Sequence, residues 1–166
     1  MIVWGVAGWK NAGKTTLVEG MVRALAARGL SASTLKRSHH GVDVDQPGRD
    51  SHRHREAGAR QVLVASARRW ALMHELRDEP EPPLEALLAR LSPVDVVLIE
   101  GWKREAHPKI EAWRPELGRA PLAQETDTVK AVATPGAAPS GAPQPHLDLD
   151  SPETAVEFLL RVRART

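Results

Sequence analysis

Two kinds of hydrophobic pattern follow one another along the first hundred residues. Residues 2–7 (IVWGVA) and 94–99 (VDVVLI) are short apolar runs, which are typical of buried β-strands. Between them, an apolar stripe at helical spacing begins at Leu17 and predicts a helix over residues 14–27, with Gly29 as its stop. We therefore expect a strand and a helix at the start of the chain, and another strand before residue 100.

The remaining patterns extend this alternation. A polar stretch at residues 38–54 and a Pro/Gly/Ala-rich stretch at residues 135–145 are expected to be loops. Because strands alternate with helices, we predict an α/β fold in a single domain, residues 1–166, with a mainly parallel twisted sheet flanked by helices. The further strands are expected at residues 31–36, 61–65, 70–76, 109–113 and 129–133, and the further helices at residues 84–91 and 154–163.

A complete phosphate-binding motif follows the first predicted strand. Residues 8–15 (GWKNAGKT) match G-x-x-x-x-G-K-[ST] and lie between a strand and a helix, which is the context that the motif needs. Glycines let the backbone approach an anion, and the N–H groups at the helix start then face the phosphates. We therefore predict a P-loop NTPase-like fold. The expected nucleotide-binding residues are Gly8, Asn11, Ala12, Gly13, Lys14, Thr15 and Thr16.

Three side chains have specific expected roles at this loop. Lys14 would reach the β- and γ-phosphates, and the Thr15 hydroxyl would bind Mg²⁺. Glu100 ends an apolar strand, as the acid of a Walker-B motif does, and would hold the metal or its water opposite Thr15. Lys14 and Glu100 are thus the predicted catalytic residues, and Thr15 and Glu100 the predicted metal ligands.

The base that the site selects stays open on this evidence. No guanine-selecting N-K-x-D motif occurs in the sequence, and residues 133–136 are the best candidate for a base loop. The polar stretch at residues 38–54 also admits two functions. His39 and His40, with the aspartates that follow, could form a transition-metal site, although adjacent histidines on an extended chain point to opposite faces. We favour a loop that senses the phosphates and Mg²⁺.

Composition narrows the classes of function. The chain has 166 residues, no cysteine and a formal net charge of +2. The lack of cysteine excludes disulfides and thiolate metal sites and fits a cytoplasmic protein. No apolar run is long enough to span a bilayer, and we expect no signal peptide. Scattered basic residues, no tyrosine and a single phenylalanine argue against nucleic-acid binding.

Several segments, taken together and in order, resemble the MobB family, the accessory proteins of molybdopterin guanine dinucleotide biosynthesis. The resemblance covers about residues 1–115 and the last predicted helix, and it is most specific outside the phosphate loop. The segments are GWKNAGKTT at residues 8–16, KRSHHG at 36–41, DQPGRDS at 45–51, EAGA at 56–59, DVVLIEGWK at 95–103 and PKIE at 108–111.

This resemblance implies a GTP-binding protein, typically a homodimer, that hydrolyses GTP slowly at best. It also implies a partner, MobA, which is the transferase that joins GMP to molybdopterin. Asp45, Gly48, Asp50 and Ser51 fall in the second motif of the family, which is expected to face the γ-phosphate or the molybdopterin cofactor. The family usually has histidine where this chain has Arg37.

Three other functions use the same residues differently. A metallochaperone-type GTPase would use His39 and His40 as metal ligands. A small-molecule kinase would need an arginine-rich lid and an acceptor-binding base, for which Arg68 and Arg69 are poor candidates. A non-enzymatic adaptor would retain its nucleotide without turnover.

Overall fold

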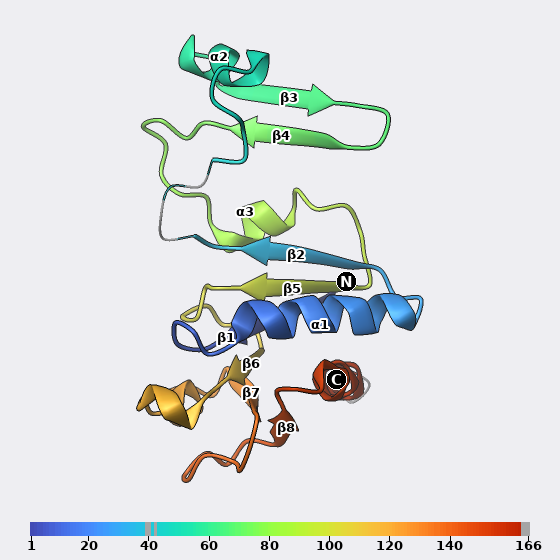
Figure 1. The fold of residues 1–166 in the computed structure, drawn as a ribbon, viewed down its shortest axis with the longest axis vertical. Coiled ribbons are helices and arrows are strands. Elements are labelled where there is room, and N and C mark those ends of the chain that lie inside the picture. Colours follow the sequence, from blue (N-terminus) through green and yellow to red (C-terminus); the bar gives the residue numbers. More distant parts are fainter. Residues whose placement is uncertain (39–40, 42, 164–166) are drawn as a thin grey trace. The chain divides into compact units, whose positions relative to one another are not determined.

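The computed structural model describes residues 1–38, 41 and 43–163 of the chain (Figure 1). The chain divides into two compact units, which we describe separately. The first consists of Met1–Arg37 and Leu91–Thr166, and we call it the sheet unit; the second is Ser38–Arg90, which we call the hairpin unit. The expectation of a single nucleotide-binding domain stays a prediction.

The sheet unit is built on six strands in the order β2-β5-β1-β6-β7-β8. Every neighbouring pair in this sheet is parallel, which confirms the predicted α/β, P-loop NTPase-like fold. Parallel pairing places the carboxyl ends of all the strands at one edge, where such sheets bind ligands. The strands are β1 (Ile2–Ala7), β2 (Ala32–Lys36), β5 (Val96–Glu100), β6 (Lys109–Ala112), β7 (Val129–Thr134) and β8 (His146–Asp148).

Two helices, α1 (Lys14–Ala27) and α4 (Pro152–Arg163), cover one face of this sheet. Alternate residues of β1 pack against them; Trp4 meets Phe158 of α4 edge to face, with ring centroids 5.8 Å apart. The helices approach closely at Gly20, where an added Cβ would lie 2.3 Å from Cγ of Pro152. This core explains why the apolar stripe of α1 predicted its bounds correctly.

The other face of the sheet carries a smaller apolar cluster. Its buried members include Ala7 at the end of β1 and Leu122 in the short helix η2 (Leu122–Gln124), and Trp9 and Trp113 pack against it. A second short helix, η1 (Pro115–Leu117), follows β6 in the same loop. The segment between β6 and β7 therefore folds back beside the phosphate loop.

The hairpin unit consists of α2 (Asp50–Glu56), β3 (Gln61–Ala65), β4 (Trp70–His74) and α3 (Leu84–Leu88). Its two strands pair only with each other, in antiparallel register. The predicted β4 and α3 were too long, by two and three residues at their C-terminal ends.

Among the described residues, the sequence analysis missed four elements: α2, β8 and the two short helices η1 and η2. Helix α2 lies where a loop was predicted, because it buries no residue and so has no apolar stripe to reveal it. Strand β8 has three residues, which is too short for an alternation to show. In the part of the chain that the structure describes, no helix is long and apolar enough to cross a membrane.

Candidate nucleotide-binding site

The phosphate loop links β1 to α1 at the carboxyl edge of the sheet. Gly8 and Gly13 have φ angles of 138° and 96°, a region that glycine adopts without a steric penalty. An added Cβ on Gly8 would lie 2.3 Å from the carbonyl oxygen of Ala112, so the loop passes directly against the end of β6. Asn11, at φ 65°, is one of the few other residue types that tolerate this region.

The start of α1 is left open for an anion. No side chain caps the helix at Gly13, and its first turn contains no acidic residue. The first N–H groups of any helix have no partner within the helix, so those of Lys14, Thr15 and Thr16 are available to a ligand. The positive end of the helix dipole adds to the attraction for a phosphate.

The Lys14 side chain lies over the loop. Its ammonium donates a hydrogen bond of 2.7 Å to the carbonyl oxygen of Trp9. Burial lowers the pKa of Lys14, and the nearby cations Lys36 and Lys103 act in the same direction, whereas Glu100 opposes them. Neighbouring cations disfavour one another's protonated forms, and an anionic ligand would relieve this repulsion.

Thr15 and Glu100 meet across the end of β5, as the sequence analysis expected. The Thr15 hydroxyl donates to both carboxylate oxygens of Glu100, at 3.1 and 3.2 Å. Lys36 is aligned with Glu100 on the neighbouring strand, and its ammonium lies 3.6 Å from Oε1. A hydroxyl and a carboxylate are hard oxygen ligands of the type that Mg²⁺ takes, so this pair fits the predicted metal.

Trp9 anchors the loop to the segment after β6. Its indole N–H donates to the carbonyl oxygen of Ala120, and that of Trp113 donates to the carbonyl oxygen of Arg119, both at 2.9 Å. Two cations lie against the Trp9 ring, with Lys103 Nζ 4.8 Å and the Arg119 guanidinium carbon 5.5 Å from its centroid. These contacts fix the loop and place positive charge beside it.

Two buried charged residues of β6 bind backbone groups of the segments before and after this strand. The Glu111 carboxylate accepts the N–H groups of Leu122 and Ala123, at 2.8 and 2.9 Å. Burial raises the pKa of Glu111, although these two bonds act in the opposite direction. The Lys109 ammonium donates to the carbonyl oxygens of Glu105 and His107. The P-K-I-E segment therefore positions loops on both sides of the site.

The basic residues after β5 lie beside a hollow next to the phosphate loop. This cavity, of about 340 Å³, is lined by Lys103, Arg104, Lys109 and Ala7, among others. The Lys109 side chain is fully buried. Lys103 and Arg104 are exposed there.

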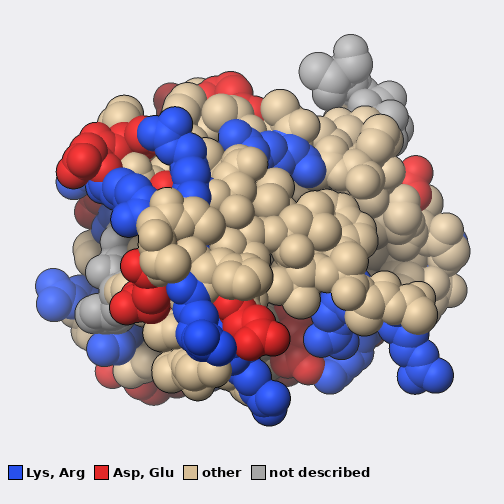
Figure 2. All heavy atoms as spheres, turned by 90° about the horizontal axis from the view of Figure 1, so that it is seen from above, with Lys and Arg blue, Asp and Glu red and all other residues tan. Residues whose placement is uncertain are grey.

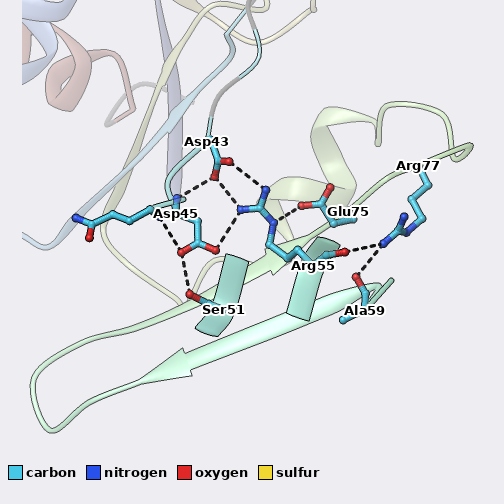
Figure 3. A network of polar contacts seen from close by, with 8 residues as sticks. Asp43, Asp45, Ser51, Arg55, Ala59, Glu75 and Arg77 are labelled. Carbon is cyan, nitrogen blue, oxygen red and sulfur yellow. Dashed lines mark hydrogen bonds and ion pairs between the residues drawn. The ribbon is translucent and has the colours of Figure 1, made fainter. Parts of the chain in front are cut away.

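The second predicted motif lies in the hairpin unit. There Arg55 binds three acidic residues, of which Asp45 belongs to the motif (Figure 3). The Arg55 guanidinium donates to Asp43 at 2.8 and 3.1 Å, to Asp45 at 3.3 Å and to Glu75 at 2.7 Å. Asp45 also accepts the Ser51 hydroxyl at 2.8 Å. The bond from Arg55 lowers the pKa of Asp43 to about 2, so the network stays ionised at neutral pH.

The structure thus forms two groups from the predicted site residues. Lys14, Thr15 and Glu100 lie together in the sheet unit, and Asp45 lies with Ser51 in the hairpin unit. Asp50 is exposed and forms a 3.8 Å ion pair with Arg53. The roles of Asp45 and Asp50 toward a nucleotide stay predictions.

The transition-metal alternative finds no support in the described residues. His39 and His40 lie outside them. Among the residues that are described, no group of three or more His, Asp or Glu side chains is placed to hold a metal ion.

Two arginines escaped the sequence analysis. Arg55 organises the acidic motif, but only the fold shows that its partners converge on it. Arg114 lies two residues after β6, beside the phosphate loop, where a Cβ added to Gly13 would be 3.7 Å from its Nε and Nη2 atoms. The rule that ligands bind at the carboxyl ends of parallel strands, which pointed to Glu100, would also have pointed to Arg114.

Comparison with known proteins agrees with this geometry. The sequence matches the profile of the family described as molybdopterin guanine dinucleotide synthesis protein B, MobB, over residues 3–135. It is 46% identical over 117 residues to the molybdopterin-guanine dinucleotide biosynthesis adapter protein of Escherichia coli, covering 69% of this chain and 67% of that protein. The protein of the same name from Haemophilus influenzae is 42% identical over 133 residues, covering 78% and 72% of the two chains.

A solved structure extends the similarity to the whole chain. The X-ray crystal structure of the MobB homologue from Bacillus stearothermophilus aligns over 100% of both chains, with a TM-score of 0.73 and 26% identity. The matched residues 3–135 include the phosphate loop, Glu100 and the P-K-I-E segment. The chain therefore belongs to the MobB family.

Proposed function

We propose that this chain is a GTP-binding adapter protein that assists the guanylyl-transfer step of molybdopterin guanine dinucleotide biosynthesis. One observation supports nucleotide binding above all others: an uncapped helix start, with Lys14 folded over it, lies next to the Thr15–Glu100 pair. The family and the adapter proteins to which the chain is similar support the pathway.

In this proposal each residue of the site has one task. The N–H groups at the start of α1 and the Lys14 ammonium bind the phosphates, and Thr15 and Glu100 hold Mg²⁺. The metal, when bound, supplies positive charge that neutralises the β- and γ-phosphate oxygens. Hydrolysis is slow at best in this proposal, as the resemblance to the family implies, and we assign no residue to orient the attacking water.

Nucleotide binding is tested by titration of the purified protein with Mg·GTP and Mg·ATP in a calorimeter. We expect a clear preference for GTP. Lys14→Ala should weaken binding by at least roughly 30-fold, because it removes a charge-assisted contact to phosphate. Lys130→Ala is the matched control, since Lys130 is exposed on β7. Equal affinity of the Lys14→Ala variant would contradict the site, and a preference for ATP would favour a kinase.

The proposed partners are a MobA-type guanylyltransferase and the molybdopterin cofactor, which the names of the related adapter proteins and the resemblance to the family together support. Pull-down of the transferase with this chain, in the presence and absence of Mg·GTP, tests the first. No capture under either condition would contradict it.

We also propose that the protein is a homodimer. The hairpin unit supports this, because one face of its strands exposes Leu63, Trp70 and Leu72, with exposed fractions of 60%, 65% and 43%. Figure 2, viewed from the side of α2 and β3 in Figure 1, shows an uncharged area bordered by acidic and basic side chains. Exposed apolar patches of this kind mark contact surfaces.

The dimer is tested by sedimentation equilibrium of the full chain. Leu72→Glu should shift the protein toward monomer, whereas Val44→Glu, an exposed position outside the two strands, should not. A monomeric unsubstituted protein would contradict the proposal.

A further inference from the structure

Arg114 lies beside the phosphate loop but belongs to the segment after β6. Its backbone is extended, at φ −133° and ψ 122°, so the side chain continues the alternation of that strand. Ile110 and Ala112 face the core under α1, and Arg114 follows on the same face. A Cβ added to Gly13 would lie 3.7 Å from both Nε and Nη2, which places the guanidinium next to the end of the phosphate loop.

The guanidinium has no partner within the described residues. The side chain belongs to a residue that is half-buried, and no hydrogen bond, ion pair or ring contact joins it to another described residue. A guanidinium carries five N–H donors, and none of the Arg114 nitrogens is among the described polar atoms that are buried without a partner, so these donors are open to solvent or to a ligand. The Arg114 guanidinium is therefore a planar cation without a partner at the carboxyl edge of the sheet, where it is available to a ligand.

The segment that carries Arg114 is held firmly. The indoles of Trp113 and Trp9 bind the carbonyl oxygens of Arg119 and Ala120, and the Glu111 carboxylate binds the N–H groups at the start of η2. A side chain on a segment anchored in this way keeps its position before a ligand arrives.

The strand order indicates which part of a nucleotide Arg114 would meet. Strand β5, with Glu100, lies on one side of β1, and β6 lies on the other. The Thr15–Glu100 pair sets the end that carries Mg²⁺ and the terminal phosphates toward β5. The nucleoside half must then extend the other way, across Gly13 and toward the end of β6, where the Leu149 Cδ2 atom also lies 3.6 Å from the added Cβ.

We infer that Arg114 binds the nucleoside half of the nucleotide, with its planar guanidinium stacked on the purine base. This inference rests on the proposed GTP site and adds the residue that holds the base, which no N-K-x-D motif supplies. Stacking of a base on a planar side chain lowers the dissociation constant by roughly 5-fold to 100-fold. A lysine has the charge but not the plane, so it does not replace the arginine here.

The test compares a ligand with a base to one without. Mg·GTP and Mg·tripolyphosphate are titrated into the unsubstituted protein and into Arg114→Ala, Arg114→Lys and Lys14→Ala variants. Arg23→Ala is the matched control, since Arg23 is exposed on α1 and, among the described residues, its side chain pairs with Glu19 alone. Thermal unfolding of each variant checks that it is folded.

We expect Arg114→Ala to weaken Mg·GTP binding by roughly 10-fold or more and to leave Mg·tripolyphosphate binding unchanged, with Arg114→Lys as weak as the alanine variant. An equal loss with both ligands would show a phosphate contact, and recovery by lysine would show that charge alone matters; either result, or no effect, overturns the inference. Failure of the proposed function differs: the unsubstituted protein would not bind Mg·GTP, or Lys14→Ala would bind both ligands normally.

Discussion

The two units of this chain are stabilised in different ways. The sheet unit buries apolar side chains on both faces of its sheet, including residues of all the helices that cover it. Among the described residues of the hairpin unit, only Val62 and Leu84 are buried, and α2 buries none. Segments of that unit are instead joined by the ion pairs of Arg55 with Asp43, Asp45 and Glu75. The candidate nucleotide-binding site is therefore supported by an apolar core, whereas the residues of the second motif are held in place by ion pairs.

The largest expected effect comes from removing a core side chain of the sheet unit. Leu25→Ala should lower the free energy of unfolding by about 2–5 kcal/mol, because Leu25 is fully buried in α1. The matched variant Leu72→Ala, at a residue 43% exposed in β4, should change it by less than about 0.5 kcal/mol at concentrations where the chain is monomeric. Urea unfolding measures both, and similar losses would contradict the contrast.

A smaller and local effect should follow from breaking the charge network. Arg55→Met leaves Asp43, Asp45 and Glu75 without their shared cation, so backbone amides of α2 and residues 43–49 should exchange with solvent faster. The strands of the sheet unit should keep their protection. Arg53→Met is the control, because its ion pair with Asp50 is long and exposed. Faster exchange throughout the protein would show that the network stabilises more than the hairpin unit.

Acid should lower the stability contributions of one titratable residue in each unit over different pH ranges. Burial lowers the pKa of His107 from 6.5 to about 4, with a smaller contribution from Lys109. The unfolded chain then binds the proton more readily, so stability should fall as the pH drops from 6.5 toward 4. We expect a loss of about 1–2 kcal/mol, less than the full shift because the residue as a whole is only partly buried, although both of its ring nitrogens are buried.

Asp43 should lose its contribution to stability over a lower pH range than His107 does. Its pKa is held near 2 in the folded chain instead of 3.8, so its contribution is present above 3.8 and lost as the pH falls through 2. Urea unfolding across this range should therefore show the His107 step first. His107→Gln should remove that step, and the exposed control His146→Gln should keep it. An unchanged step in His107→Gln would assign it to another group.

The contrast between the units also explains what the sequence could predict. The bounds of α1 and, to within two residues at either end, five of the six strands of the sheet were predictable, because their apolar patterns face the buried clusters of the sheet unit. The hairpin unit has few buried positions, and α2 therefore escaped. The phosphate loop and Glu100 were found from local motifs. The contacts of Glu111 with η2 and the position of Arg114 beside Gly13 bring together residues that are apart in the chain, so no local motif predicts them, and only the general rule on strand ends could have indicated Arg114.

The bond between Lys14 and the Trp9 carbonyl has a consequence for the thermodynamics of loading. An ammonium has three N–H donors, so Lys14 can keep this bond while its other donors face a phosphate. In the proposed site the side chain would already be held at the loop when a ligand arrives, and binding would not have to restrain a free lysine chain. The contact would therefore lower the entropic cost of loading the proposed nucleotide.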